Sequence, residues 1–168
     1  MEKVLIWAAV IILVIWVIKK RNAFESLRQD IKKAGSEISN YMKKREDSLN
    51  DALSIAKLSY GKEVEGIERL TASDKLEQLS FLGEKYPVLQ TMGSYSSAVN
   101  EAFQLNHDIT ASRTTLNSNI NEYNKVIKAF PGLIVALIFG YKEEKLIDQE
   151  NLAAHRHLDM KGVDFSNY

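Results

Sequence analysis

A regular spacing of apolar residues in the second half of the chain limits the folds that this sequence can adopt. From residue 92 to residue 130, the positions of one stripe lie alternately three and four residues apart. This alternation is typical of an α-helix that packs one face against another helix. It predicts one helix of about forty residues, about 60 Å long. The stripe consists of Met92, Tyr95, Val99, Ala102, Asn106, Ile109, Arg113, Leu116, Ile120, Tyr123, Ile127 and Phe130.

The first half of the chain has a similar stripe, which begins at Phe24 and shifts phase at Leu49. It predicts a helix over residues 22–60 that continues directly from the segment before it. A shorter helix is expected after Thr71, with Asp74 accepting the free N–H groups at its start. Pro87 should end that helix and begin the next one.

Two long amphipathic helices cannot bury their stripes alone, so they require each other and at least one shorter helix. We therefore expect an all-α protein, with an N-terminal transmembrane helix followed by an elongated up-and-down or antiparallel bundle of three to four helices. The expected divisions are an anchor at 1–21, the bundle at 22–142 and a polar C-terminal tail at 143–168. One helix between residues 61 and 87 would make the long helices parallel, and two would make them antiparallel. The sequence leaves both arrangements open.

Residues Val4–Ile18 form an unbroken run of fifteen apolar residues. As a helix this run covers about 22 Å, against about 30 Å for a bilayer core. Flanking lysines can extend its reach toward the headgroups, and the indole rings near its two ends favour the interface. We expect a membrane-spanning helix with the residues Val4, Leu5, Ile6, Trp7, Ile11, Ile12, Leu13, Trp16 and Ile18.

A cleaved signal peptide is the alternative interpretation of this run. A signal peptide carries positive charge before its apolar core and small residues after it. Here Glu2 offsets Lys3, and the positive cluster follows the run instead, which favours an uncleaved anchor. Because positive flanks stay in the cytoplasm, we expect the N-terminus outside and the helical domain inside. The topology-setting residues are Lys19, Lys20 and Arg21.

Composition and motifs argue against several classes of function. Basic and acidic residues number 22 each, so the net charge is zero and no nucleic-acid partner is expected. There is no cysteine, and His155 and His157 are two residues apart, which does not suit a helical metal pair. Phosphate-loop, nucleophile-elbow and zinc-protease motifs are absent from the sequence. We expect no catalytic residue, no metal site and no cofactor.

Two arginines, Arg45 and Arg113, fall on the apolar stripes, where an unpaired charge is costly. Their stems can cover the edge of the core while the charged groups reach water. Alternatively, they form a buried polar layer with Asn106 or Asn117 that fixes the register of the helices. Tyr123 lies on the stripe and Asn124 beside it, and we expect structural roles for both.

A second apolar run at residues 133–139 is too short to span a membrane. As a helix it is apolar on all faces, which is more than one bundle groove can bury. It either caps the end of the bundle with the tail folded over it, or forms an exposed patch for self-association or for contact with lipid. The candidate contact residues are Leu133, Ile134, Val135, Leu137, Ile138 and Phe139.

The pattern from Tyr86 to Lys142 resembles the LemA family of membrane-anchored bacterial helical-bundle proteins. The resemblance rests on Tyr86-Pro-x-Leu89, Arg113, Asn117, Tyr123-Asn124, Phe130-Pro131 and the segment GLIVALIFGYK. It implies a helical bundle and membrane attachment, and it brings no established reaction. One departure is Asp47-Ser-Leu-Asn-Asp51, where the family has Asp-Leu-Ile-Pro-Asn.

Together these features favour a structural or scaffold protein without catalytic activity, anchored in the bacterial cytoplasmic membrane and self-associating through its bundle. The expected partners are the lipid bilayer, further copies of the chain and an unidentified protein. The alternative is a membrane-tethered adaptor or sensor that binds a soluble or membrane protein.

Overall fold

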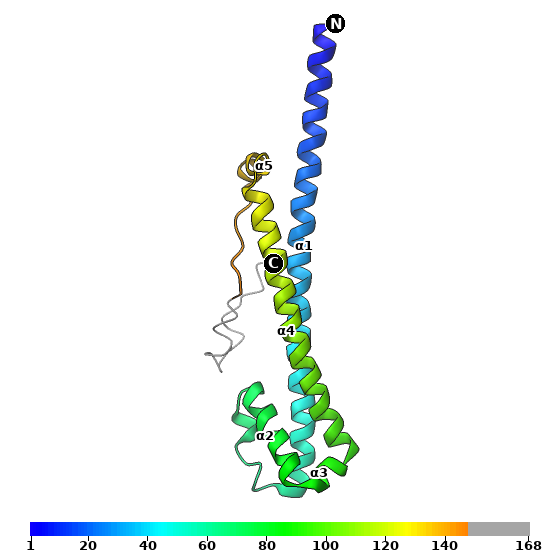
Figure 1. Cartoon of the computed structure of the whole chain (residues 1–168), viewed down its shortest axis with the longest axis vertical. Helices are drawn as coiled ribbons and strands as arrows, with labels where there is room; N and C mark the ends of the chain where they lie inside the picture. The colour runs from blue at the N-terminus through cyan, green and yellow to red at the C-terminus, as the bar shows by residue number, and fades with distance from the viewer. Residues whose placement is uncertain (148–168) are drawn as a thin grey trace. The chain divides into compact units, whose positions relative to one another are not determined.

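The computed structural model describes residues 1–147, and every regular element in that part of the chain is helical. The expected all-α class is therefore confirmed. The elements in chain order are α1 (Glu2–Tyr60), the short 3₁₀ helix η1 (Ile67–Arg69), α2 (Ala72–Lys85), α3 (Pro87–Thr91), α4 (Gly93–Lys128) and α5 (Gly132–Phe139), as Figure 1 shows.

Both long helices form where the apolar stripes predicted them. α1 begins at Glu2, so the N-terminal apolar run and the first stripe share one uninterrupted helix. α4 ends at Lys128, just before the Phe130-Pro131 pair. Within residues 1–147, the combined length and apolarity needed to cross a bilayer are not found in any helix. The transmembrane helix stays a prediction.

The described residues divide into two compact units. The first unit contains residues 1–34 and 114–147, and the second contains residues 35–113. Two α-helices, α2 and α3, lie between the long helices. In the first unit Asp30 of α1 meets Asn119 of α4, and Phe24 lies beside Gly132 further along the chain. The α1 and α4 segments of this unit are thus antiparallel, as expected for two intervening helices.

The core of the second unit is built where α1, α2, α3 and α4 meet. Leu79 of α2 and Leu89 of α3 are fully buried, and the ring of Tyr95 packs with them. The Tyr95 hydroxyl donates to the Leu79 carbonyl at 2.5 Å, and burial raises the pKa of Tyr95 to about 12. The other members of this core are Leu49, Ala52, Leu53, Ala56, Val64, Ile67, Leu76, Leu82, Ala98, Val99 and Ala102.

The start of α2 lies in the predicted N-cap region, directly after Thr71. Thr71 is the N-cap, and its hydroxyl oxygen accepts from the Asp74 N–H at 3.3 Å. Asp74 sits one turn in, and its carboxylate accepts from the Thr71 hydroxyl at 2.9 Å. The Thr71 hydroxyl thus satisfies one free N–H group of the first turn, while its own proton is bound by the Asp74 carboxylate. Pro87 starts α3, as predicted.

Two glycines allow α5 to pack where it does. A Cβ atom on Gly132 would lie 2.5 Å from the Val126 carbonyl oxygen and 3.3 Å from the Phe24 ring. Only glycine lets the chain come that close to α4 and α1. After α5, Gly140 adopts a left-handed conformation with φ of 73°, and the Tyr141 N–H donates to the Ala136 carbonyl at 3.0 Å. This turn directs the following residues away from the axis of α5.

We expect the substitution Leu79→Ala to lower the free energy of unfolding by about 2–5 kcal/mol, because it leaves a cavity in a fully buried site. Phe81→Ala on the same helix is the matched control, since Phe81 is 60 % exposed and should cost about 0.5 kcal/mol or less. Urea unfolding of the full chain in mild detergent, followed by circular dichroism, measures both. Equal losses for the two variants would contradict this account of the core.

Candidate functional site

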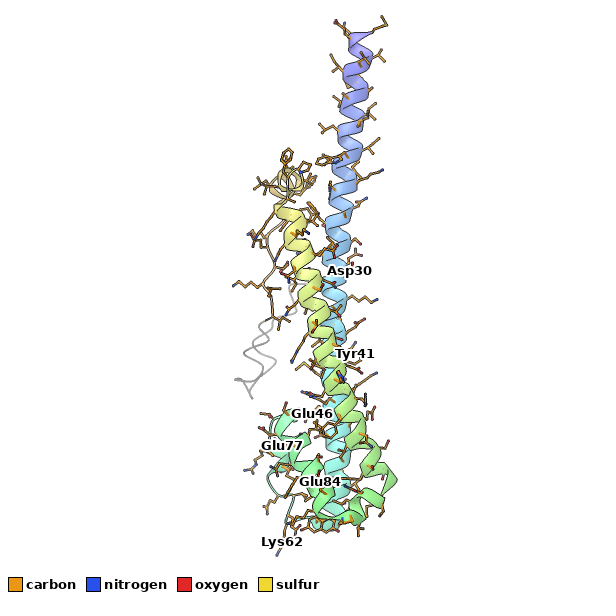
Figure 2. The ribbon with its side chains drawn as sticks, viewed as in Figure 1. Asp30, Tyr41, Glu46, Lys62, Glu77 and Glu84 are labelled. Atoms are coloured by element: carbon orange, nitrogen blue, oxygen red, sulfur yellow. The ribbon has the colours of Figure 1, made fainter. Side chains whose placement is uncertain are left out.

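The N-terminal part of α1 presents a long apolar surface. Eleven large apolar side chains between Val4 and Ile18 are exposed, with exposed fractions from 43 to 72 %. Figure 2 shows side chains projecting from all sides of this part of the helix. No described residue covers them, whereas Trp16 and Val17 at the end of the run are half-buried. Of the nine residues predicted to span a membrane, all but Trp16 belong to this exposed set, which we call the apolar segment.

The positive cluster follows the apolar segment at once on the same helix. Lys19 and Arg21 are exposed and Lys20 is half-buried. The Arg21 guanidinium lies 5.3 Å from the centroid of the Phe139 ring, which is a cation–π distance. The last residue of α5 is therefore in contact with the end of the positive cluster.

Two further contacts hold the end of α5 against α1. The rings of Phe24 and Tyr141 meet edge to face with centroids 5.3 Å apart. The Tyr141 hydroxyl donates to the Glu25 carboxylate at 2.6 Å. Burial and this hydrogen bond, with the negative charge of Glu25, raise the pKa of Tyr141, while Arg21 opposes the shift. The phenol therefore stays protonated and keeps its role as donor.

The helix α5 has one buried side and one exposed side. Val135 is fully buried and Ala136 nearly so, and both lie on the inner side. The inclusion of Val135 in the predicted contact patch was wrong, because the helical period turns that residue toward the core. The other five residues form the outer face of α5, with exposed fractions of 43–74 %: Leu133, Ile134, Leu137, Ile138 and Phe139.

Two asparagine side chains of α4 hold the segment that follows α5. The Asn124 amide donates to the Glu144 carbonyl at 2.8 Å and accepts from the Glu144 N–H at 3.0 Å. Asn117 makes the same pair of bonds with Ile147, at 2.8 and 2.9 Å. Each amide thus pairs with the backbone N–H and carbonyl of one residue, as a neighbouring β-strand would. We call this arrangement the asparagine clasp.

The spacing of the clasp follows from the geometry of helix and strand. Asn117 and Asn124 are seven residues apart, which is two helical turns or about 10.5 Å along α4. The peptide groups that they bind are three residues apart, which spans about 10 Å in an extended chain. The two lengths agree only when residues 144–147 are nearly fully extended and run back along α4, as the orange segment of Figure 1 does.

Tyr123 packs beside the clasp as a buried ring that is 1 % exposed. Burial and the nearby Glu144 carboxylate raise its pKa, so the phenol is neutral at ordinary pH. Its place on the stripe of α4 is that of a core residue. The structural roles expected for Tyr123 and Asn124 stay predictions.

Arg45 and Arg113 are both partly buried in the second unit. Arg45 donates from Nη1 to Asn106 Oδ1 at 2.6 Å, while its Nε is buried and has no hydrogen-bond partner in the described chain. Burial lowers the pKa of both guanidinium groups. The positive charge of Arg45 further lowers that of Arg113, so two like charges face each other. Of the two asparagines expected to join a buried layer, Asn106 is exposed and accepts from Arg45, while Asn117 belongs to the clasp. The buried polar layer stays a prediction.

A buried lysine was missed in the sequence analysis. Lys75 is 3 % exposed, and its Nζ donates to Glu46 at 2.5 Å and to Asn50 Oδ1 at 3.2 Å. Figure 2 labels Glu46 where α1 passes α2. The sequence pattern could have predicted the burial of Lys75, because Lys75, Leu79 and Leu82 share one stripe at helical spacing. A lysine on such a stripe requires a partner, and this one ties α2 to α1.

In the part of the chain that the structure describes, the side chains that could bind a metal ion do not form a site. Among residues 1–147, no cluster of three or more histidine, aspartate or glutamate side chains could hold a metal ion. His107 is exposed on α4. His155 and His157 lie outside the described residues.

We expect Asn124→Ala to release the segment after α5, because it removes both hydrogen bonds to Glu144, worth about 1–3 kcal/mol together. Lys142 and Lys145 lie in that segment and are exposed, so trypsin should cleave there faster in the variant. Asn121→Ala, at an exposed position of the same helix, is the control. Identical cleavage rates for both variants would show that the clasp does not hold the segment.

Comparisons with known proteins give one result. The model of the LemA family matches residues 62–161, more than half of the chain. The match includes α2 to α5 and both residues of the asparagine clasp, while α1 precedes it. Neither the curated proteins nor the solved structures provide a match. The extent of the family match is sufficient to establish that the chain belongs to the LemA family.

Proposed function

We propose that the chain is a membrane-anchored scaffold of the bacterial cell envelope. Its apolar segment inserts into the cytoplasmic membrane, and its helical domain self-associates on the cytoplasmic side. The observation that carries this proposal is the exposure of eleven large apolar side chains on a helix that continues directly into a packed helical domain. An apolar surface of this extent on a water-soluble protein would promote aggregation.

The length of the apolar segment sets a condition on insertion. Fifteen helical residues cover about 22 Å, which is shorter than a typical bilayer core of about 30 Å. Local thinning of the bilayer and the long side chains of Lys3, Lys19 and Lys20 can make up the difference. Each central Leu, Ile or Val contributes about 0.3–0.6 kcal/mol to insertion, so the segment as a whole favours lipid.

Self-association is supported by the effect of anchoring. Confinement to a membrane raises the local concentration of the domains, so weak contacts between copies suffice for assembly. The second unit carries large apolar side chains that its own core leaves exposed: Leu58, Phe81, Val88 and Phe103. These residues are available for contact with further copies.

We expect the full chain to stay in the membrane pellet after alkaline carbonate washing. The double substitution Ile11→Asp with Ile15→Asp should release it, because two carboxylates near the centre of a span cost about 6 kcal/mol. The matched control carries Leu58→Asp with Phe81→Asp, which adds the same charge to exposed sites of the second unit. Release of the unaltered chain by carbonate would refute the anchor.

The side of the membrane on which the helical domain lies can be tested by labelling of single cysteines. The chain contains no cysteine, so a single Glu2→Cys or Ser59→Cys substitution introduces one unique thiol. A membrane-impermeant maleimide should label Glu2→Cys on intact cells, and Ser59→Cys only after permeabilisation. The reversed pattern would place the domain outside the cell.

Light scattering in detergent tests self-association. For a scaffold, we expect a protein mass that is a multiple of 19.1 kDa and that falls on dilution. A mass equal to one chain at all concentrations would contradict the scaffold and favour the alternative, a membrane-tethered adaptor that binds a different protein.

A further inference from the structure

The outer face of α5 is an apolar surface that the described part of the chain leaves uncovered. Residues 133, 134, 137 and 138 recur at the period of a helix and form one stripe along its length. Leu137 and Ile138 are the most exposed, at 74 % and 68 %. The helix contains no charged residue, and its eight residues extend only about 12 Å, too short to span a bilayer.

Contacts within the first unit fix where this face lies along α1. Phe139 stacks on Arg21, and the next residues bring Tyr141 onto Phe24 and Glu25. Gly132 at the other end of α5 also approaches the Phe24 ring. The whole of α5 is thus held beside residues 21–25. That level begins about 4.5 Å beyond Ile18, the last residue of the apolar segment.

This level corresponds to the headgroup region if the apolar segment is inserted. Arg21 belongs to the positive cluster, whose ammonium and guanidinium groups favour the phosphate layer and attract anionic lipids. A helix held beside Arg21 therefore reaches the boundary between headgroups and acyl chains. Binding at that boundary becomes stronger with the apolar area that is buried and with the attraction of nearby cationic side chains to anionic lipids, and the outer face of α5 and Arg21 supply these two terms.

We propose that α5 lies in the bilayer–water interface, with its outer face in contact with anionic phospholipid. This inference rests on the proposed insertion of the apolar segment. The chain then contacts the membrane at two points, the anchor and α5, which together orient the first unit relative to the lipid surface. Bending of α1 near residue 21 would lift α5 from the lipid, so the second contact opposes that motion.

The test uses tryptophan fluorescence of the full chain in vesicles of phosphatidylethanolamine and phosphatidylglycerol. Trp7 and Trp16 are replaced by phenylalanine, and Leu137→Trp provides the reporter on α5. Leu58→Trp in the same background is the control, because Leu58 is 88 % exposed in the second unit. Co-flotation with the vesicles reports insertion of the apolar segment in both variants.

We expect the Leu137→Trp emission to shift to shorter wavelength in vesicles and to lose intensity when the lipids are brominated near the headgroup end of their chains. The Leu58→Trp emission should not be quenched by the brominated lipids, whether or not contact between copies shifts its wavelength. Flotation without quenching of Leu137→Trp would overturn the inference while leaving the anchor intact. Failure to float would overturn the proposed anchoring, and the inference with it. A blue-shifted emission that bromination does not quench would show that protein covers α5, and would also overturn the inference.

Discussion

The antiparallel pairing of α1 with α4 in the first unit determines where α5 lies. Each helix carries an apolar stripe that needs a long partner, and the two intervening helices let the chain reverse direction between them. In the first unit this reversal returns the chain to residues 21–34 of α1. The apolar residues of α5 therefore end beside the positive cluster although they lie more than a hundred residues away in sequence. Without the pairing, α5 would not be held beside Arg21.

Periodicity made much of the fold predictable from the sequence. The stripes gave the two long helices, and Pro87 marked the boundary between α2 and α3. Periodicity shows which face of a helix is buried only where the other faces are polar, and it does not show what covers that face. The run of seven apolar residues around Val135 has no polar face, so the inward position of Val135 could not be predicted. The direction of α4 depended on the short α3, which has too few residues to display a period.

The partners of charged residues on the apolar stripes were harder to predict from the sequence than the helices themselves. Arg45, Arg113 and Lys75 carry the same signal, a charge where an apolar residue is expected, and the structure resolves them in different ways. Lys75 has a carboxylate and an amide within reach. Arg45 has one amide and a buried Nε that finds no partner among residues 1–147. The sequence shows that such a charge needs compensation, whereas the partner comes from another helix and depends on its register.

The asparagine clasp has a consequence for how this surface can change. Its amides bind only main-chain N–H and carbonyl groups, so they constrain the path of residues 144–147 and not the identity of their side chains. That strip of the molecule can accept different charges or shapes without altering its trajectory. Substitutions of these side chains should therefore leave the backbone path of residues 144–147, and α4 beneath it, unchanged.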